Sequence, residues 1–413
     1  MQANQAGLVF SANGEELIPG IPNEITLDHI VTKIPWRVFH ILSSVSPVWL
    51  HAIRSRQVHD ARVRSHSAET LILINRELDS NCASIIELFS MRDNSCCQLP
   101  PIPGFRDGFP RKPQCVSIDG KVYVLGGQVR CRGEVSWKEE ASAKVYVFDV
   151  AGQVQWLECA NMKKAKIDFG CGVLDGKIYI CGGESASRRS RPDPVSEVYN
   201  PKENTWSPIS PIPSLRVRHL VTAVGQELFV HKGQICVQFI SRICRIPVNR
   251  RAQPGHPSTS TSVTKSMECA DFFEIYNPVK DEWRLVKPPK FFGCDFVAHG
   301  KLHRINEERG IELFDSQQNS WVHLHSVSYA LSGQVEQVGS GCVTIIHAFN
   351  DELLAIVFCE NRKRCCLVRS SGLGSEKKEI VFQETPVSSP SGDLQRRYSH
   401  QLRLSIQMSR ILL

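Results

Sequence analysis

Short apolar runs, each preceded by a turn and separated by polar stretches, recur along most of the chain. The run DGKVYVLGG at 119–127 returns almost unchanged as DGKIYICGG at 175–183. Weaker copies stand at 225–233, 299–307 and 350–358, where the apolar residues persist and the glycine pair is lost. An Asp-Gly pair before an apolar run predicts a turn that leads into a β-strand. Two glycines mark the end of that strand, where the backbone bends or packs closely.

A second segment also recurs, and its copies alternate along the chain with those of the first. It reads EVYNPKENTW at 197–206, EIYNPVKDEW at 274–283, ELFDSQQNSW at 312–321 and ELFSMRDNSC at 87–96. Each copy begins with Glu, has an aromatic residue in the third place and ends with Trp or, once, with Cys. A longer copy, VYVFDVAGQVQW, occupies 145–156. The pattern predicts a strand that carries the aromatic residue, a polar turn, and a further strand that begins with Trp.

Together the two segments define units of short β-strands, each about the size of a propeller blade. We therefore expect a mainly β fold over 67–413. Its units fall at 67–104, 111–162, 163–213, 214–289, 290–327 and 328–386.

The first unit is one strand short. Near the end of the chain, YSHQLRLSIQM at 398–408 alternates apolar and polar residues like a half-buried strand. We predict that this strand completes the first blade and closes the ring, because closure removes sheet edges that would otherwise aggregate.

The N-terminal region has a helical period instead. Between Ile21 and Ile53, apolar residues fall at three- to five-residue steps, and Pro35 interrupts the run. These features predict a small helical domain at 17–60, preceded by a disordered terminus at 1–16. A domain of this size buries little apolar surface, so it needs a partner or the adjacent β domain to be stable.

Composition narrows the classes of function. The chain has 413 residues and a net charge of +7, which is too small and too dispersed to indicate nucleic-acid binding. No apolar run approaches the length that spans a bilayer, so no membrane partner is expected. The sixteen cysteines form no CxxC pair, and buried free thiols of a reducing compartment, the cytoplasm or nucleus, explain them best.

No cofactor or metal site is expected from the sequence. A phosphate-binding loop would require Lys and Ser or Thr after the glycines, whereas Glu184 and Ser185 follow them. The fourteen histidines are dispersed, and the pattern HExxH of metalloproteases and GxSxG of hydrolases are both absent. We therefore expect a protein without an active site of its own.

The glycine pairs, the spaced aromatic residues and the unit length resemble kelch repeats. The resemblance is strong at 111–213, fair at 214–327 and poor at 328–386. It implies a kelch β-propeller of about six blades, in which glycines end the second strand and aromatic residues pack between blades. The residues to which it gives this structural role are Gly126, Gly127, Gly182, Gly183, Tyr199, Tyr276, Trp156, Trp206, Trp283 and Trp321.

The helical domain resembles an F-box, and together the two regions look like plant F-box/kelch-repeat proteins. The family's two Leu-Pro pairs are matched by Ile-Pro pairs, and its Val-Cys-x-x-Trp element by Val-Ser-x-x-Trp. The resemblance implies that this domain docks on a Skp-type adaptor and, through it, on a cullin-RING ubiquitin ligase. The docking residues would be Ile21, Pro22, Ile25, Ile30, Ile34, Pro35, Val45 and Trp49. Some of them, Trp49 in particular, could instead fill the domain's own core.

A target protein would bind the propeller. The loops after the second strand are long at 128–143, 184–194 and 233–268, and they open on one face. Arginine forks onto carboxylates, so these loops predict a rim for an acidic target. The rim residues are Arg130, Arg132, Trp137, Arg188, Arg189, Arg191, Arg242 and Arg245. The alternative is that these loops are merely solvated.

The sequence thus predicts a substrate-recognition subunit of an SCF-type ubiquitin ligase that marks a target for degradation. One alternative is a kelch scaffold that binds proteins without ligase function; a copper-dependent kelch oxidoreductase is a remote third. Plant relatives are linked to turnover of phenylpropanoid or flavonoid enzymes and of hormone-response regulators, which offers an analogy for the target.

Overall fold

The computed structural model of the chain describes most of residues 16–412. Its gaps lie at 54, 66, 78–83, 91, 106–107, 133–136, 151–154, 186–191, 232–233, 245–258, 270–271, 288–293, 307–309, 332–333, 337–342, 350–351, 360–363, 372–378 and 385–407. The terminus expected to be disordered lies outside the described residues except for Glu16.

Helices occupy the N-terminal part of the described chain, as the apolar spacing predicts. They are α1 (Asn23–Ile25), the π-helical turn η1 (Thr26–Ile30), the 3-10 turns η2 (Val31–Lys33) and η3 (Trp36–Val38), α2 (Phe39–Val45), α3 (Pro47–Ile53) and α4 (Arg56–Arg64). We call residues 16–64 the helical unit. Its small core consists of Leu17, Leu27, Val31, Phe39, Trp49, Ala52, Ile53 and Val58.

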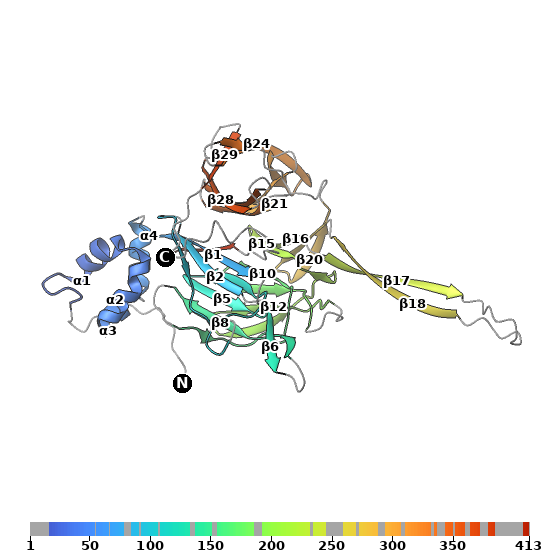
Figure 1. The fold of residues 1–413 in the computed structure, drawn as a ribbon, viewed down its shortest axis with the longest axis horizontal. Helices are drawn as coiled ribbons and strands as arrows, with labels where there is room; N and C mark the ends of the chain where they lie inside the picture. Colours follow the sequence, from blue (N-terminus) through green and yellow to red (C-terminus); the bar gives the residue numbers. More distant parts are fainter. Residues whose placement is uncertain are drawn as a thin grey trace, which may run out of the picture.

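The rest is a β-propeller, which confirms the predicted fold class (Figure 1). Blade 1 comprises β1 (Thr70–Glu77), β2 (Ser84–Ser90), β3 (Cys96–Gln98) and β30 (Met408–Leu412). Blade 2 comprises β4 (Gln114–Ile118), β5 (Lys121–Leu125), β8 (Val145–Asp149) and β9 (Leu157–Glu158). Blade 3 comprises β10 (Gly170–Leu174), β11 (Lys177–Cys181), β12 (Ser196–Asn200) and β13 (Thr205–Ile209). Blade 4 comprises β15 (Leu220–Val224), β16 (Glu227–His231), β19 (Phe273–Asn277) and β20 (Glu282–Val286).

A fifth blade continues into a larger sheet. Blade 5 comprises β21 (Cys294–Ala298), β22 (Lys301–Ile305), β23 (Gly310–Asp315) and β24 (Ser320–Leu331). The following strands are β25 (Gln334–Glu336), β26 (Val343–Phe349), β27 (Glu352–Cys359), β28 (Arg364–Ser371) and β29 (Glu379–Glu384). Because β24 is twelve residues long and pairs in parallel with β29, the sixth expected unit extends this sheet and does not form a separate one.

Blade 1 is completed by the end of the chain. β30 pairs antiparallel with β1, so that Thr70 lies opposite Leu412 and Ile74 opposite Met408. The strand was expected at 398–408, but residues 398–407 lie outside the described chain. The first and last strands of the propeller are therefore hydrogen-bonded to one another.

Two of the three long loops contain β-hairpins. β6 (Gln128–Arg132) pairs with β7 (Trp137–Ala141), and β17 (Gln234–Cys244) pairs with β18 (Thr259–Cys269) over eleven residues. The second hairpin extends far from the blades (Figure 1). Alternation in QICVQFISRIC and the β-branched residues of TSTSVTKSMEC were the sequence signals for these strands.

Hydrogen bonds from tryptophan side chains link neighbouring blades. The indole Nε1 of Trp206, in blade 3, donates to the carbonyl of Ala160, in the connection from blade 2, over 2.8 Å. In blade 4, Trp283 donates to Ser210 at the same distance, and in blade 2 Trp156 donates to Pro100 over 2.7 Å. Blades 2, 3 and 4 are therefore each hydrogen-bonded to the chain that leaves the preceding blade, whereas the indole N–H of Trp321 in blade 5 has no such partner among the described residues.

The glutamate that begins the second repeated segment has a structural role. Glu274, on β19, is fully buried and accepts from the backbone N–H of Ser214 over 2.8 Å and from its hydroxyl over 2.6 Å. Glu197, on β12, accepts from the backbone N–H of Lys163 over 3.0 Å. These carboxylates hold the connections that enter their own blades, which explains why the pattern repeats them.

The glycine pairs lie where neighbouring backbones approach one another. Gly182 and Gly183 have φ of 62° and 89°, in the left-handed region. A Cβ on Gly182 would lie 2.7 Å from the carbonyl oxygen of Arg216, which precedes blade 4. One on Gly183 would lie 2.6 Å from Cβ of Phe169, which precedes blade 3. The pair therefore serves close packing of the backbone at the ends of the blades.

The variant Gly183→Ala is expected to destabilise the propeller more than Gly176→Ala. Both glycines have positive φ, so each substitution costs about 1–2 kcal/mol of backbone strain. No atom lies within 4 Å of a Cβ on Gly176, whereas Gly183→Ala adds a steric clash of roughly 1–3 kcal/mol. Urea unfolding checks the difference, and equal losses would contradict this account of the glycine pair.

Stability should fall as the pH drops from 7 to 5, because of His219. Burial, and to a smaller extent the nearby charge of Arg216, lower the pKa of this imidazole to about 3. In the unfolded chain the group takes up a proton near pH 6.5, whereas in the folded chain it stays neutral until about pH 3. The stability it contributes is therefore complete above pH 6.5 and is lost progressively below it. The loss between pH 7 and 5 is roughly 2 kcal/mol.

Urea unfolding of wild type and His219→Leu at several pH values isolates this contribution, because leucine does not titrate. We expect a flatter profile for the variant. Parallel profiles would show that His219 is not the group responsible.

Candidate functional site

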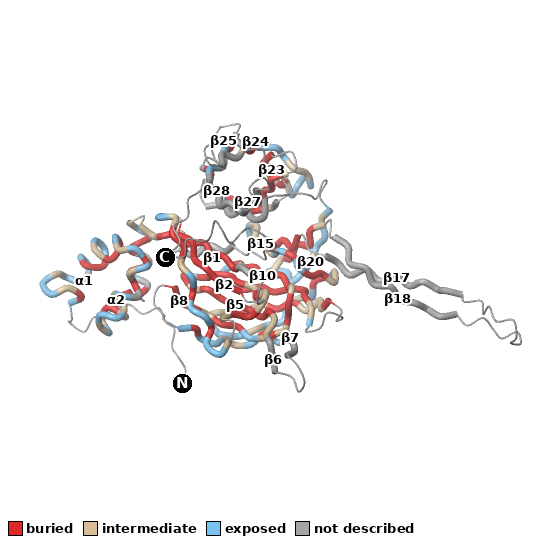
Figure 2. Tube along the Cα trace, viewed as in Figure 1, coloured by how far each residue is buried: buried red, intermediate tan, exposed pale blue. Residues whose placement is uncertain are grey.

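The helical unit exposes large apolar side chains to solvent. Ile25 is 48% exposed, and Ile41 and Val45, one turn apart on α2, are 54% and 62% exposed. Figure 2 shows exposed segments along this unit, whereas the strands of the blades are mostly buried. Ile41 and Val45 lie on one face of α2 and form an exposed apolar pair, which makes this face a candidate for contact with another protein.

The expected docking residues differ in their exposure to solvent. Those that are exposed are Pro22, Ile25, Pro35 and Val45, and those that are half-buried are Ile21, Ile30 and Ile34. The remaining one, Trp49, is buried. Ile41 was not among the expected docking residues, although its i, i+4 spacing from Val45 places the two side chains on the same face of a helix.

Trp49 belongs to the core of the helical unit. It is 9% exposed, packs with Leu27 and Phe39, and its Nε1 donates to the carbonyl of Leu17 over 3.0 Å. Of the two roles considered for Trp49, the structure places it in the core, because a buried indole needs both apolar neighbours and a hydrogen-bond acceptor.

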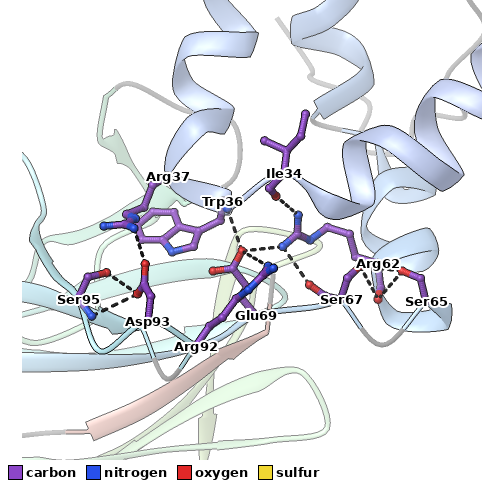
Figure 3. A network of polar contacts seen from close by, with 10 residues as sticks. All are labelled: Ile34, Trp36, Arg37, Arg62, Ser65, Ser67, Glu69, Arg92, Asp93 and Ser95. Carbon is purple, nitrogen blue, oxygen red and sulfur yellow. Dashed lines mark hydrogen bonds and ion pairs between the residues drawn. The ribbon is translucent and has the colours of Figure 1, made fainter. Parts of the chain in front are cut away.

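The pair Ile34–Pro35 is held at both ends (Figure 3). The carbonyl of Ile34 accepts from Arg62 Nη1, on α4, over 2.6 Å. The backbone N–H of Trp36 donates to Glu69 Oε1, just before β1, over 3.0 Å. Pro35 has no N–H, so these bonds fix the polar groups on either side of it.

Arg62 and Glu69 form a buried ion pair. Nη2 of Arg62 lies 2.9 Å from Oε1 of Glu69, and their side chains are 1% and 3% exposed. Arg62 also donates to the carbonyl of Ser67 over 3.1 Å and lies over the ring of Phe39. Burial lowers the pKa of the guanidinium and the Glu69 carboxylate opposes that shift, so the group stays charged. We call Arg62 and Glu69 the clamp.

The helical unit is anchored directly on blade 1. Trp36, although it lies among the helical turns, packs in the propeller core with Leu71 and Leu88. Beside it, Arg37 forms an ion pair with Asp93, in the turn between β2 and β3 (Figure 3). This junction joins the two units through one apolar anchor and several charges. The junction could not be predicted from the sequence, because no periodicity distinguishes Trp36 from a residue of the helical core.

A second surface lies on one face of the propeller. There, the segments that connect one blade to the next pair with the loops that follow the second strand in blades 2, 3 and 4. Ile167 pairs with Glu184, and Arg111 pairs with Gln128, in isolated two-residue bridges. β14 (Arg216–Val217) pairs in the same way with β17. In each of these blades, the segment before the first strand and the segment after the second strand therefore lie on the same face of the propeller.

Charges of both signs lie on this face. Arg218 pairs with Asp168 over 3.3 Å, Arg111 with Glu139 over 3.2 Å, and Lys164 with Asp193 over 3.0 Å. Lys112, Asp168 and Arg218 occupy equivalent positions before their blades, each with φ near 50°. Burial and the neighbouring Asp168 raise the pKa of Glu184. The described part of this face is thus mixed in charge.

The expected rim residues cannot be placed individually. The backbones of Arg130, Arg132, Trp137 and Arg242 lie in the two hairpins, and their side chains are outside the described set. Arg188, Arg189, Arg191 and Arg245 lie outside the described residues. The hairpins that carry the first group begin on the face described above.

The buried cysteine and histidine side chains of blades 3 and 4 make contacts that favour a structural role over a catalytic one. Sγ of Cys181 lies 3.4 Å from Nε2 of His219, but burial raises the pKa of this thiol to about 12, the reverse of an activated cysteine. A chain of contacts runs from Thr222 through His231 to Asp295, with both distances 2.9 Å. The His and Asp side chains are buried, and the chain connects blade 4 with blade 5.

The described residues contain no cluster of three or more His, Cys, Asp or Glu side chains able to hold a metal ion. Within the same part of the chain, no helix has the length and apolarity needed to cross a membrane.

Comparison with known proteins finds matches to kelch repeats and to F-box/kelch-repeat proteins. The Kelch motif family matches residues 167–213, which coincide with blade 3. A putative F-box/kelch-repeat protein of Arabidopsis thaliana is 30% identical over 203 residues, covering 48% of this chain and 57% of that protein. Two further F-box/kelch-repeat proteins of this plant are 25% and 23% identical. They cover 67% and 79% of this chain, and 74% and 82% of their own lengths.

These likenesses confirm the resemblance to F-box/kelch-repeat proteins that the sequence motifs indicated. The names of these relatives mention neither phenylpropanoid nor flavonoid enzymes nor hormone-response regulators. The expectation of such a target therefore gains no support.

Proposed function

We propose that this chain, a relative of F-box/kelch-repeat proteins, is a substrate-recognition subunit of an SCF-type ubiquitin ligase. The observation that carries the proposal is the exposed apolar surface of Ile25, Ile41 and Val45 on a helical unit that is fixed to a propeller. The helical unit docks on a Skp-type adaptor, and the propeller binds the target protein.

The chain contributes proximity to the reaction and no chemistry. A ligase assembled on the adaptor brings a charged ubiquitin-conjugating enzyme close to a lysine of the bound target, which raises the effective concentration of the reacting groups. A rigid connection between docking surface and propeller serves this role, because it limits the positions that the target can take. We place the complex in the cytoplasm or nucleus.

The target is proposed to present an acidic surface to the arginine-rich hairpins and loops. Arginine forms paired, charge-assisted hydrogen bonds with carboxylates and is frequent among residues that dominate binding energy. The acidic groups on the described face already have basic neighbours, such as Arg218 for Asp168. Arg188, Arg189 and Arg191 then supply further positive charge.

A kelch scaffold without ligase function is the second candidate. The observation in its favour is that Ile replaces Leu in both Leu-Pro pairs of the F-box pattern. Such a protein would fold in the same way and bind targets, but it would not capture an adaptor.

Substitution of Asp for both Ile41 and Val45 is expected to abolish adaptor capture without unfolding the chain. Both side chains are mostly exposed, so the charges meet water in the free protein. In a complex they would be buried, and loss of two apolar anchors should weaken binding at least about thirtyfold. Titration calorimetry with a purified Skp-type adaptor measures the change, with thermal unfolding as the check on folding.

Val279→Asp is the matched control, because Val279 is 85% exposed on the turn between β19 and β20 of blade 4. This variant should bind the adaptor like wild type. If folded wild-type protein does not bind the adaptor at all, the scaffold is the correct function.

Replacement of Arg188, Arg189 and Arg191 by Gln should weaken binding of acidic peptides about tenfold and leave adaptor binding unchanged. An array of acidic peptides, read at two salt concentrations, tests this. Arg64→Gln is the control, since Arg64 is 65% exposed on α4 in the helical unit. Equal peptide binding by the triple variant and wild type would remove these arginines from the target surface.

A further inference from the structure

The backbone on either side of Pro35 is held by residues that no motif includes. Ile34 offers its carbonyl to Arg62, and Trp36 offers its N–H to Glu69 (Figure 3). Pro35 itself is exposed, and the side chain of Ile34 is half-buried. The exposed Pro35 and the half-buried Ile34 thus lie on a backbone whose flanking polar groups, the carbonyl of Ile34 and the N–H of Trp36, both bind buried charged side chains.

We propose that Arg62 and Glu69 are positioning residues that present Ile34–Pro35 to the adaptor, and that blade 1 thereby helps to form the docking surface. This inference rests on the proposed function. It extends that function, because the adaptor site then requires Glu69, which lies at the start of the propeller and outside the helical unit.

The geometry of the clamp supports a positioning role. Arg62 donates through two nitrogens to three acceptors, the carbonyls of Ile34 and Ser67 and the carboxylate of Glu69. Glu69 in turn accepts from Trp36 and Arg62, while Arg92 lies 3.5 Å away. Bonds to charged groups are among the stronger hydrogen bonds in proteins, so they restrict the backbone that they bind.

Trp36 fixes the position of the clamp relative to the propeller. Its side chain is buried in the apolar cluster between blades 1 and 2, which also contains Leu71 and Trp156. The peptide that precedes it therefore cannot rotate freely, and Ile34–Pro35 has one orientation relative to blade 1. Preorganisation of this kind raises affinity because less conformational entropy is lost on binding.

The test compares two buried ion pairs in the full-length chain. The clamp variant combines Arg62→Met with Glu69→Leu. The control combines Arg216→Met, in β14, with Glu274→Leu, in blade 4; the two side chains are fully buried and 2.9 Å apart. The control pair also binds backbone, the N–H of Ser214 and the carbonyl of Phe272. Both double variants should therefore lose comparable stability.

Affinity for a purified Skp-type adaptor and amide hydrogen exchange at Trp36 are measured on both variants, at a temperature where both are folded. We expect the clamp variant to bind about tenfold more weakly and to exchange the Trp36 amide faster, while the control matches wild type in both. Glu69→Gln, whose amide oxygen can still accept from Trp36, should bind with an affinity between those of the clamp variant and wild type.

Each outcome decides the proposal. Equal affinities of the clamp variant and the control would overturn the positioning role and leave the adaptor function intact. So would unchanged exchange at Trp36. No binding by folded wild-type protein would overturn both the adaptor function and this extension of it.

Discussion

The propeller is built on contacts between blades, because a single four-stranded sheet of this size has no core of its own. Trp156 of blade 2 packs against Phe109 and Phe148 and donates a hydrogen bond to the chain that leaves blade 1. The same bond recurs at Trp206 and Trp283. Since each indole combines a large apolar area with one polar group that must be satisfied, a single residue type can fix both the spacing and the orientation of neighbouring sheets.

The junction with the helical unit also depends on a tryptophan at the edge of the ring, but here the indole supplies apolar area alone, because its N–H is buried without a hydrogen-bond partner among the described residues. Trp36 extends the apolar layer between blades 1 and 2 to a segment that precedes the propeller in sequence. Buried charges surround it, and an ion pair of this kind tolerates little displacement, because removal of either partner leaves an uncompensated charge. The helical unit therefore behaves as a part of blade 1 and not as a module on a flexible linker.

Repetition explains which features could be read from the sequence. The Gly182–Gly183 pair and Trp206 belong to segments that recur in the same order along the chain, so the blades could be recognised by aligning the chain with itself. The contacts of Arg62 and Glu69 occur once, join segments that no period relates, and use residue types that are usually solvated. Nothing in the sequence distinguishes them from surface charges.

The same reasoning applies to the later units and to the candidate site. The fifth and sixth units had lost the glycine pair, so their strands were expected but not their joining through the parallel pairing of β24 with β29. On the helical unit, exposure distinguished Ile41 and Val45 from Trp49, although all three are apolar residues at helical spacing. Periodicity identifies an apolar face, but packing decides which of its residues remain accessible.

The pairing of β30 with β1 has a consequence for synthesis of the protein. Blade 1 begins at Thr70, yet its fourth strand leaves the ribosome about 330 residues later. At typical translation rates this interval is roughly 20–70 s, during which the edge of β1 has no intramolecular partner. Contacts so distant in sequence form slowly, and an unpaired apolar edge invites association with other chains. The edge of β1 is therefore open to such association until β30 has been made.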